Sequence, residues 1–182
     1  MNSKSNEILF LLGRSASGKT TTLNELVKRG EYKNLVSYTT RAIRDNEIEG
    51  IDYHFVDIDT FNSLGLKVTF EVNESWKYGL SFNELKGRYV FQAISQDYIY
   101  SAMQEAQKNG FNVKLIVFSL SRVERLRRLL SRGETEESIQ KRFEIESNEG
   151  DYNLDLFDNF NCRVINTDNL TVNDMVNEVL KE

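Results

Sequence analysis

Eight consecutive residues near the N-terminus have the types and spacing of a phosphate-binding loop, G-x-x-x-x-G-K-[ST]: Gly13-Arg14-Ser15-Ala16-Ser17-Gly18-Lys19-Thr20. Glycines let the backbone wrap closely around a phosphate group with its N–H groups turned inward. Lys19 would reach the β- and γ-phosphates of a nucleoside triphosphate, and Thr20 would bind Mg²⁺ through its hydroxyl. We therefore expect ATP and Mg²⁺ to bind here, on Gly13, Ser15, Ser17, Gly18, Lys19, Thr20 and Thr21.

The alternative is a chance match on a flexible loop, and the flanking residues argue against it. The apolar run 8–12 predicts a buried strand before the loop, and residues 19–29 predict a helix that Gly30 ends. A strand that leads into a helix N-terminus is the setting in which such a loop binds anions. Triphosphate binding is the strongest prediction from this sequence.

The rest of the chain alternates between strand and helix signals. Ser81 with Glu84, and Ser121 with Glu124, fit capping boxes that would begin two helices. We expect strands at 35–38, 53–56, 67–72, 89–94, 113–118 and 163–165, and helices at 81–87, 96–109, 121–132, 134–149 and 171–180. This alternation predicts an α/β fold of the P-loop NTPase kind, in which helices cover both faces of a parallel central sheet as three layers.

Composition narrows the function classes. The 182 residues include 40% hydrophobic ones, enough for the core of one domain, and no apolar run is long enough to cross a membrane. The net charge of −5 argues against general affinity for nucleic acid. A single cysteine, Cys162, and a short polar N-terminus suit a cytoplasmic protein. Monomer and homodimer both stay open.

Several further motifs occur in the order found in guanylate kinases. Residues 37–44 read S-Y-T-T-R-A-I-R, residues 50–56 read G-I-D-Y-H-F-V, and Tyr78-Gly79 follows. Residues 132–142 resemble the mobile lid of that family, and residues 164–168 resemble its V-x-N-D stretch. The sequence is thus similar to the guanylate kinase family over nearly its whole length.

The resemblance implies three functional regions and a role for each. Core residues 1–36, 88–131 and 154–182 would hold ATP, residues 37–87 would form a small insert that binds the nucleoside monophosphate, and residues 132–153 would form a helical lid. Arg41, Arg44, Tyr53 and Tyr78 match residues that hold the acceptor's phosphate, and arginine suits such bidentate binding. Ser37 and Glu71 match residues that contact guanine. For each arginine alone, a solvated surface charge is the plainer interpretation.

Arginine is concentrated in residues 121–132, where Glu124 is the one acid. Such a cluster could neutralise charge on the phosphoryl oxygens during transfer, or could form an ordinary solvated helix face. The resemblance supports Arg128, Arg132 and Arg142 as lid arginines, and Lys19, Arg41, Arg132 and Arg142 as the residues that promote transfer. Asn166 would either face the adenine of ATP or shape a turn.

The sequence departs from the family on the acceptor side. Where guanylate kinases usually carry two acids on the strand before the long helix, this chain has Gln92 and Ile94. The first acid would lie near magnesium, which prefers carboxylate oxygen, and the second would help read guanine. Asp97 could replace one charge. The favoured function is transfer of phosphate from ATP to GMP or dGMP.

The alternatives are a kinase for another phosphorylated acceptor, such as another nucleotide or a ribose bisphosphate, and a binding domain without turnover. Intact Lys19 and Thr20 favour an enzyme, because scaffolding relatives typically have degraded phosphate loops. The expected partners are small nucleotides.

Overall fold

A computed structural model describes residues 6–45, 47–72, 75–93, 95–149 and 151–181. Its helices are α1 (Lys19–Lys28), α2 (Ile58–Ser63), α3 (Gln96–Lys108), α4 (Arg122–Ser131), α5 (Glu136–Glu149) and α6 (Val172–Leu180), with a short 3₁₀ helix at Leu154–Phe157. Its strands are β1 (Glu7–Gly13), β2 (Lys33–Asn34), β3 (Tyr38–Thr39), β4 (His54–Phe55), β5 (Val68–Val72), β6 (Trp76–Leu80), β7 (Arg88–Ala93), β8 (Asn112–Ser119) and β9 (Asn161–Asn166). None of the described helices is both long and apolar enough to cross a membrane.

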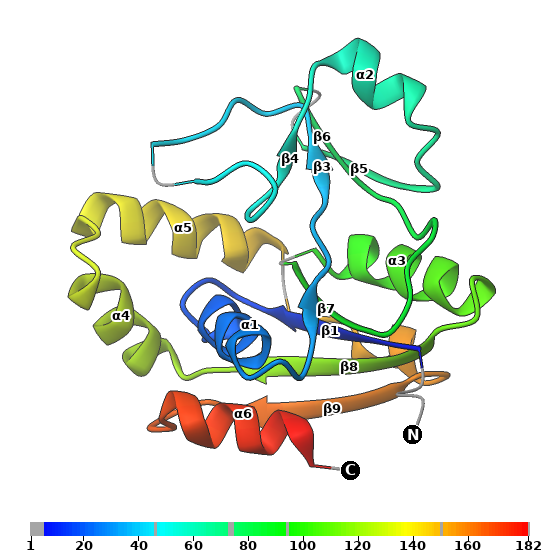
Figure 1. Ribbon diagram of the computed structural model, residues 1–182. Helices are drawn as coiled ribbons and strands as arrows, with labels where there is room; N and C mark the ends of the chain where they lie inside the picture. Colours follow the sequence, from blue (N-terminus) through cyan, green and yellow to red (C-terminus); the bar gives the residue numbers. More distant parts are fainter. Residues whose placement is uncertain (1–5, 46, 73–74, 94, 150, 182) are drawn as a thin grey trace.

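The central sheet has the strand order β2-β7-β1-β8-β9, and every neighbouring pair is parallel. Because the strands run the same way, their carboxyl ends meet at one edge, which is where α/β sheets bind ligands. That edge lies on the left of Figure 1, next to α4 and α5. The predicted parallel α/β fold is confirmed.

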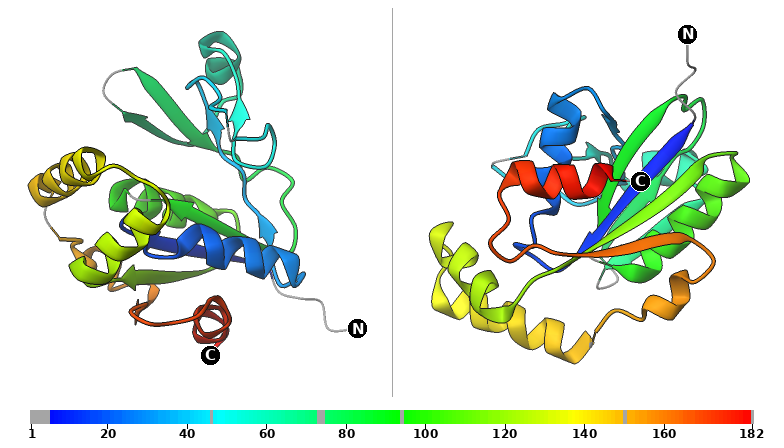
Figure 2. Two further views of the ribbon diagram at one scale, coloured as in Figure 1. Left: turned by 90° about the vertical axis from the view of Figure 1, so that its left-hand side faces the viewer. Right: turned by 90° about the horizontal axis from the view of Figure 1, so that it is seen from below.

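Helices cover both faces of this sheet, because alternate residues of β1 point to opposite sides. Ile8, Phe10 and Leu12 pack with α3, whereas Leu9 and Leu11 pack with α1 and α6. All five side chains are buried. The right-hand view of Figure 2 shows α1 and α6 on one side of the sheet and α3 on the other, as three layers.

Residues 38–80 include a second sheet with the order β4-β3-β6-β5. It stands above the core in Figure 1, over the carboxyl edge of the central sheet. The predicted strand at 35–38 is wrong as one element: β2 pairs with β7 in the central sheet, and β3 pairs with β6 in the second. The chain passes from one sheet to the other here, so no single ladder can include all of these residues.

The helix predicted at 81–87 is also wrong. Asn83 donates its backbone N–H to the Ser81 hydroxyl, and Glu84 has a φ of 63°, which an α-helix does not allow. Phe82 is buried in the core from this irregular segment. Burial of Phe82 therefore outweighs the weak helix signal of so short a segment.

Candidate active site

The loop between β1 and α1 has the conformation that its glycines permit. Gly18 has a φ of 102°, and a Cβ on it would lie 2.7 Å from the Met175 sulfur. A Cβ on Gly13 would lie 2.8 Å from the Phe118 carbonyl oxygen. Both positions therefore require glycine, and α1 begins directly after Gly18, so its first N–H groups lack partners within the helix. This is the backbone geometry of an anion cup.

Lys19 lies inside this loop and is buried. Its ammonium donates to the carbonyl oxygens of Gly13 at 2.6 Å and Arg14 at 3.1 Å. Burial, reinforced by the positive charges of Arg132 and Arg125, lowers the pKa of Lys19 to about 7. A bound polyphosphate would supply the negative charge that this ammonium lacks.

Arginines from the helical region approach the same loop. Arg142 donates to the Ser15 hydroxyl at 2.9 Å and to Glu134 at 3.0 Å. Arg125 pairs with Glu146, and burial together with the charges of Arg14 and Arg142 lowers its pKa to about 10. Like charges have thus been brought together around the loop, and an anion bound between them would relieve their repulsion.

Thr20 is at the start of α1, facing the end of β7. Its hydroxyl donates to the side-chain oxygen of Gln92 at 3.1 Å. Thr20 and Gln92 therefore lie together at the mouth of the loop. Among the described residues, no cluster of three or more His, Cys, Asp or Glu side chains could hold a metal by itself.

One cavity of about 950 Å³ joins the loop to the second sheet. Residues 14–20, with Arg132 and Arg142, form one wall, and Ser37, Tyr53, Glu71 and Tyr78 form the opposite one. Gln92 and Asp97 lie between the two walls. The structure therefore brings most of the predicted donor and acceptor residues to a single space large enough for small ligands.

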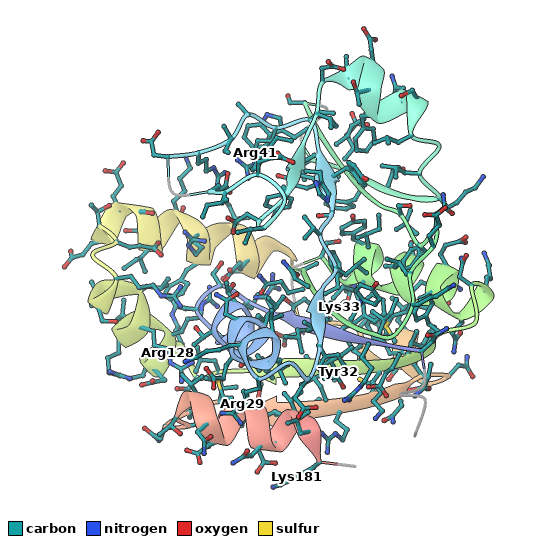
Figure 3. The ribbon with its side chains drawn as sticks, in the orientation of Figure 1. Arg29, Tyr32, Lys33, Arg41, Arg128 and Lys181 are labelled. Atoms are coloured by element: carbon teal, nitrogen blue, oxygen red, sulfur yellow. The ribbon has the colours of Figure 1, made fainter. Side chains whose placement is uncertain are left out.

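Arg41, which was predicted to hold the acceptor's phosphate, is buried and paired with a carboxylate. Only 5% exposed, it forms a bidentate pair with Glu47, at 2.9 and 2.6 Å, and donates to the Tyr78 hydroxyl at 3.2 Å. This pair raises the pKa of Arg41 further above its usual value. Arg41 and Arg44 are outside the set of residues that line the cavity, and Arg44 is exposed. Figure 3 shows Arg41 beside the second sheet, just after β3, and far from Arg128.

The remaining acceptor residues lie close to one another. Tyr53 and Tyr78 contact each other edge to face, with ring centroids 5.6 Å apart, and the Arg41 guanidinium lies 5.4 Å from the Tyr53 ring centroid. Ser37 is buried, and Glu71 is exposed in β5 opposite Lys77 of β6. Tyr78 thus links the buried arginine to the cavity.

A second hollow of about 620 Å³ lies on the other side of the loop. It is lined by Gly18, Thr21, Arg128 and Arg132, among others. Arg128 donates to the carbonyl oxygens of Thr167 at 2.6 Å and Ala16 at 3.3 Å, which fixes it against the loop. This hollow could hold the part of a nucleotide that extends beyond its phosphates.

Asn166 does not line that hollow. Its side-chain oxygen accepts the Asp168 backbone N–H at 2.8 Å. This hydrogen bond fits the turn role, and a contact between Asn166 and adenine stays a prediction.

Comparison with known proteins identifies the family. The guanylate kinase family model matches residues 5–181. The chain belongs to the guanylate kinase family. It is 33% identical to a guanylate kinase of Alkalilimnicola ehrlichii over 69% of this chain and 64% of that relative, less than two thirds of its length. It is 30% identical to one of Clostridium acetobutylicum over 78% of this chain and 70% of the relative.

A solved structure shares the guanylate kinase fold with this chain. The crystal structure of guanylate kinase from Anaplasma phagocytophilum has a TM-score of 0.60 and 24% identity, covering 97% of this chain and 84% of that one.

The chain differs from the family pattern at Gln92, which accepts a hydrogen bond from Thr20 at the position where the resemblance implies an acid. The second departure, Ile94, lies outside the described residues.

The sequence did not point to three residues in or beside the large cavity. Glu47 pairs with Arg41, Tyr98 lines the cavity, and Thr167 donates to the Ser17 carbonyl oxygen at 3.0 Å. For Glu47 the one local hint is an acid six residues after Arg41, and that spacing does not specify an ion pair. For Tyr98 and Thr167 no local pattern in the sequence pointed to the site.

Proposed function

We propose that this protein transfers the terminal phosphoryl group of ATP to a nucleoside monophosphate, with GMP and dGMP as the favoured acceptors. The observation that carries the proposal is the single cavity with the phosphate loop on one wall and Ser37, Tyr53 and Tyr78 on the other. Transfer needs the two phosphates close together and in line, and a shared cavity provides that arrangement. Family membership supports the same reaction.

In this reaction an oxygen of the acceptor's phosphate attacks the γ-phosphorus of ATP. The bond between the γ-phosphorus and the bridging β-oxygen breaks, leaving ADP and a nucleoside diphosphate. Lys19, Arg132 and Arg142 are the residues that would offset the negative charge on the moving phosphoryl group. The chemistry is positioning and charge stabilisation, so no nucleophilic side chain is required.

The donor would extend from the loop into the second hollow, past Thr21 and Arg128. The residues fit a magnesium ion: Thr20 offers a hydroxyl, Gln92 is beside it, and ATP would supply phosphate oxygens. When bound, magnesium would neutralise negative charge on the β- and γ-phosphates.

We propose a cytoplasmic location for this activity, in line with the single cysteine.

On the acceptor side, Tyr53 and Tyr78 would bind the phosphate, with Arg41 acting from behind Tyr78. Ser37 and Glu71 would contact the base. Residues 37–87 would form the acceptor-binding unit. Residues 132–153, which include Arg142, would close as a lid over both nucleotides.

The test is a panel of acceptors with the purified protein. Mg·ATP is supplied with GMP, dGMP, AMP, CMP, UMP and ribose 1,5-bisphosphate, and ADP formation is measured together with the phosphorylated product. We expect the highest kcat/KM with GMP or dGMP. Preference for another member of the panel, or tight nucleotide binding without any product, would contradict the proposal.

A further inference from the structure

Tyr98 carries a buried hydroxyl group that the proposed reaction leaves without a role. The residue is 6% exposed and lines the large cavity. Within the part of the chain that the structure describes, its oxygen makes no hydrogen bond of good geometry. A buried, unpaired hydroxyl is unfavourable, and a ligand that hydrogen-bonds to it would remove that cost.

The Tyr98 ring packs against two other aromatic rings, and its backbone is anchored at the start of α3. It stacks on Phe70 with ring centroids 5.6 Å apart and an interplanar angle of 24°, and it meets Phe91 edge-on at 5.7 Å. Its backbone N–H donates to Ser95, the N-cap residue of α3. A polar group on so well packed a ring is already oriented before any ligand arrives, which is what a specific contact needs.

The surroundings of this hydroxyl belong to the acceptor wall. Burial raises the pKa of Tyr98, the nearby Tyr53 and Tyr78 add to that rise, and a side-chain hydrogen bond of poor geometry with Ser37 opposes it. The phenol therefore stays protonated at neutral pH, so it can both donate and accept a hydrogen bond. Phe70 precedes Glu71 in β5, so the ring is also next to the strand that carries the predicted base-contacting acid.

We propose that Tyr98 is a specificity-determining residue whose hydroxyl hydrogen-bonds to the base of the acceptor nucleotide. This inference rests on the proposed function, because it requires a nucleoside monophosphate on the acceptor wall. A site with a fixed polar group discriminates strongly against bases that leave the group unpaired. Tyr98 would thus contribute to base selection.

The test compares the wild type with Tyr98→Phe and, as a control on the same helix, Tyr100→Phe. Tyr100 accepts a hydrogen bond from Gln104 and packs on Phe157 and Phe160, outside the set that lines the cavity. Dissociation constants for GMP, IMP and AMP are measured by calorimetry without ATP. The ATP dissociation constant and the midpoint of thermal unfolding are measured for each protein.

For Tyr98→Phe we expect GMP binding to weaken about five- to tenfold, the size of one hydrogen bond, and the preference between GMP and AMP to change by the same factor. ATP affinity should not change, and the unfolding midpoint should stay the same or rise, because an unpaired buried hydroxyl adds no stability. Tyr100→Phe should leave the base preference unchanged.

Unchanged GMP affinity in Tyr98→Phe would overturn the inference alone. An equal loss for all three nucleotides would place the hydroxyl at the phosphate or ribose and would also overturn it. If the wild type bound none of the three, the proposed function itself would fail, and the inference with it.

Discussion

On the donor side of the cavity, positive side chains around the phosphate loop outnumber the glutamates that pair with them, whereas on the acceptor side Arg41 is matched one to one by Glu47. Lys19 and Arg125 both have lowered pKa values because burial and neighbouring positive charges disfavour their charged forms. Arg41 instead has a raised pKa because Glu47 accepts two of its hydrogen bonds. The donor side therefore has a net positive charge before a ligand binds, whereas the net charge of the acceptor side is closer to zero.

This difference suggests how each side selects its ligand. Surplus positive charge favours a polyphosphate with little regard to its base. A neutralised arginine, aromatic rings and buried hydroxyls favour a ligand with fewer charges and a particular pattern of hydrogen bonds. The four predictions below test that contrast.

Lys19→Ala should have the largest effect. The substitution removes the ammonium inside the loop, and we expect kcat to fall by about 10²–10³-fold, the usual loss for one charge-stabilising donor. Steady-state kinetics with Mg·ATP and GMP measure this. Lys28→Ala, which removes an exposed lysine of α1, is the control and should leave kcat unchanged. Equal activity of both variants would remove the charge-stabilising role given to the loop.

Glu47→Ala should weaken the acceptor side while sparing the donor side. The substitution leaves Arg41 buried without its carboxylate, which should raise KM for GMP about tenfold and lower the free energy of unfolding by roughly 3 kcal/mol. KM for ATP should be unchanged. Kinetics and urea unfolding measure the two effects, with exposed Glu49→Ala as the control. A lower KM for GMP would show instead that Glu47 competes with the acceptor's phosphate.

The lowered pKa of Lys19 predicts proton uptake when ATP binds. Above pH 7 the lysine of the nucleotide-free protein is largely neutral, and the bound phosphates should raise its pKa again. Binding at pH 8 should therefore take up close to one proton, and the dissociation constant should rise by up to about tenfold per pH unit above pH 7. Calorimetry in two buffers of different ionisation enthalpy counts the protons. Lys19→Met should take up none; equal uptake by that variant would assign the proton to another group.

Gln92→Glu should have the smallest effect, at the boundary between the two sides. It places a carboxylate beside Thr20, where a hard cation would be favoured. We expect the magnesium concentration for half-maximal rate to fall a few-fold, about three- to fivefold, with little change in acceptor preference. Gln104→Glu on the exposed face of α3 is the control. A changed acceptor preference without a change in magnesium dependence would place Gln92 on the acceptor side.

Much of the fold was predictable, because its signals are local. The strand before the loop, the glycines, and the helix after it occur within about twenty residues, and each appears where it was expected. The segment 81–87 failed because its capping pattern competes with burial of Phe82, and burial depends on contacts with distant strands. The strand at 35–38 failed because the chain leaves the central sheet after β2 at Asn34 and enters the second sheet only at Tyr38, so residues 35–37 connect the two sheets.

The sequence by itself therefore determined the geometry of the phosphate loop, because that loop is built from consecutive residues whose glycines set the backbone conformation. It also named Ser37, Tyr53, Glu71 and Tyr78, which line the cavity. Only the tertiary structure decided that Arg41 pairs with Glu47 and that the Tyr98 hydroxyl is buried without a hydrogen bond of good geometry. Side-chain pairing and burial depend on which elements pack together, and the spacing of residues along the chain does not specify that packing.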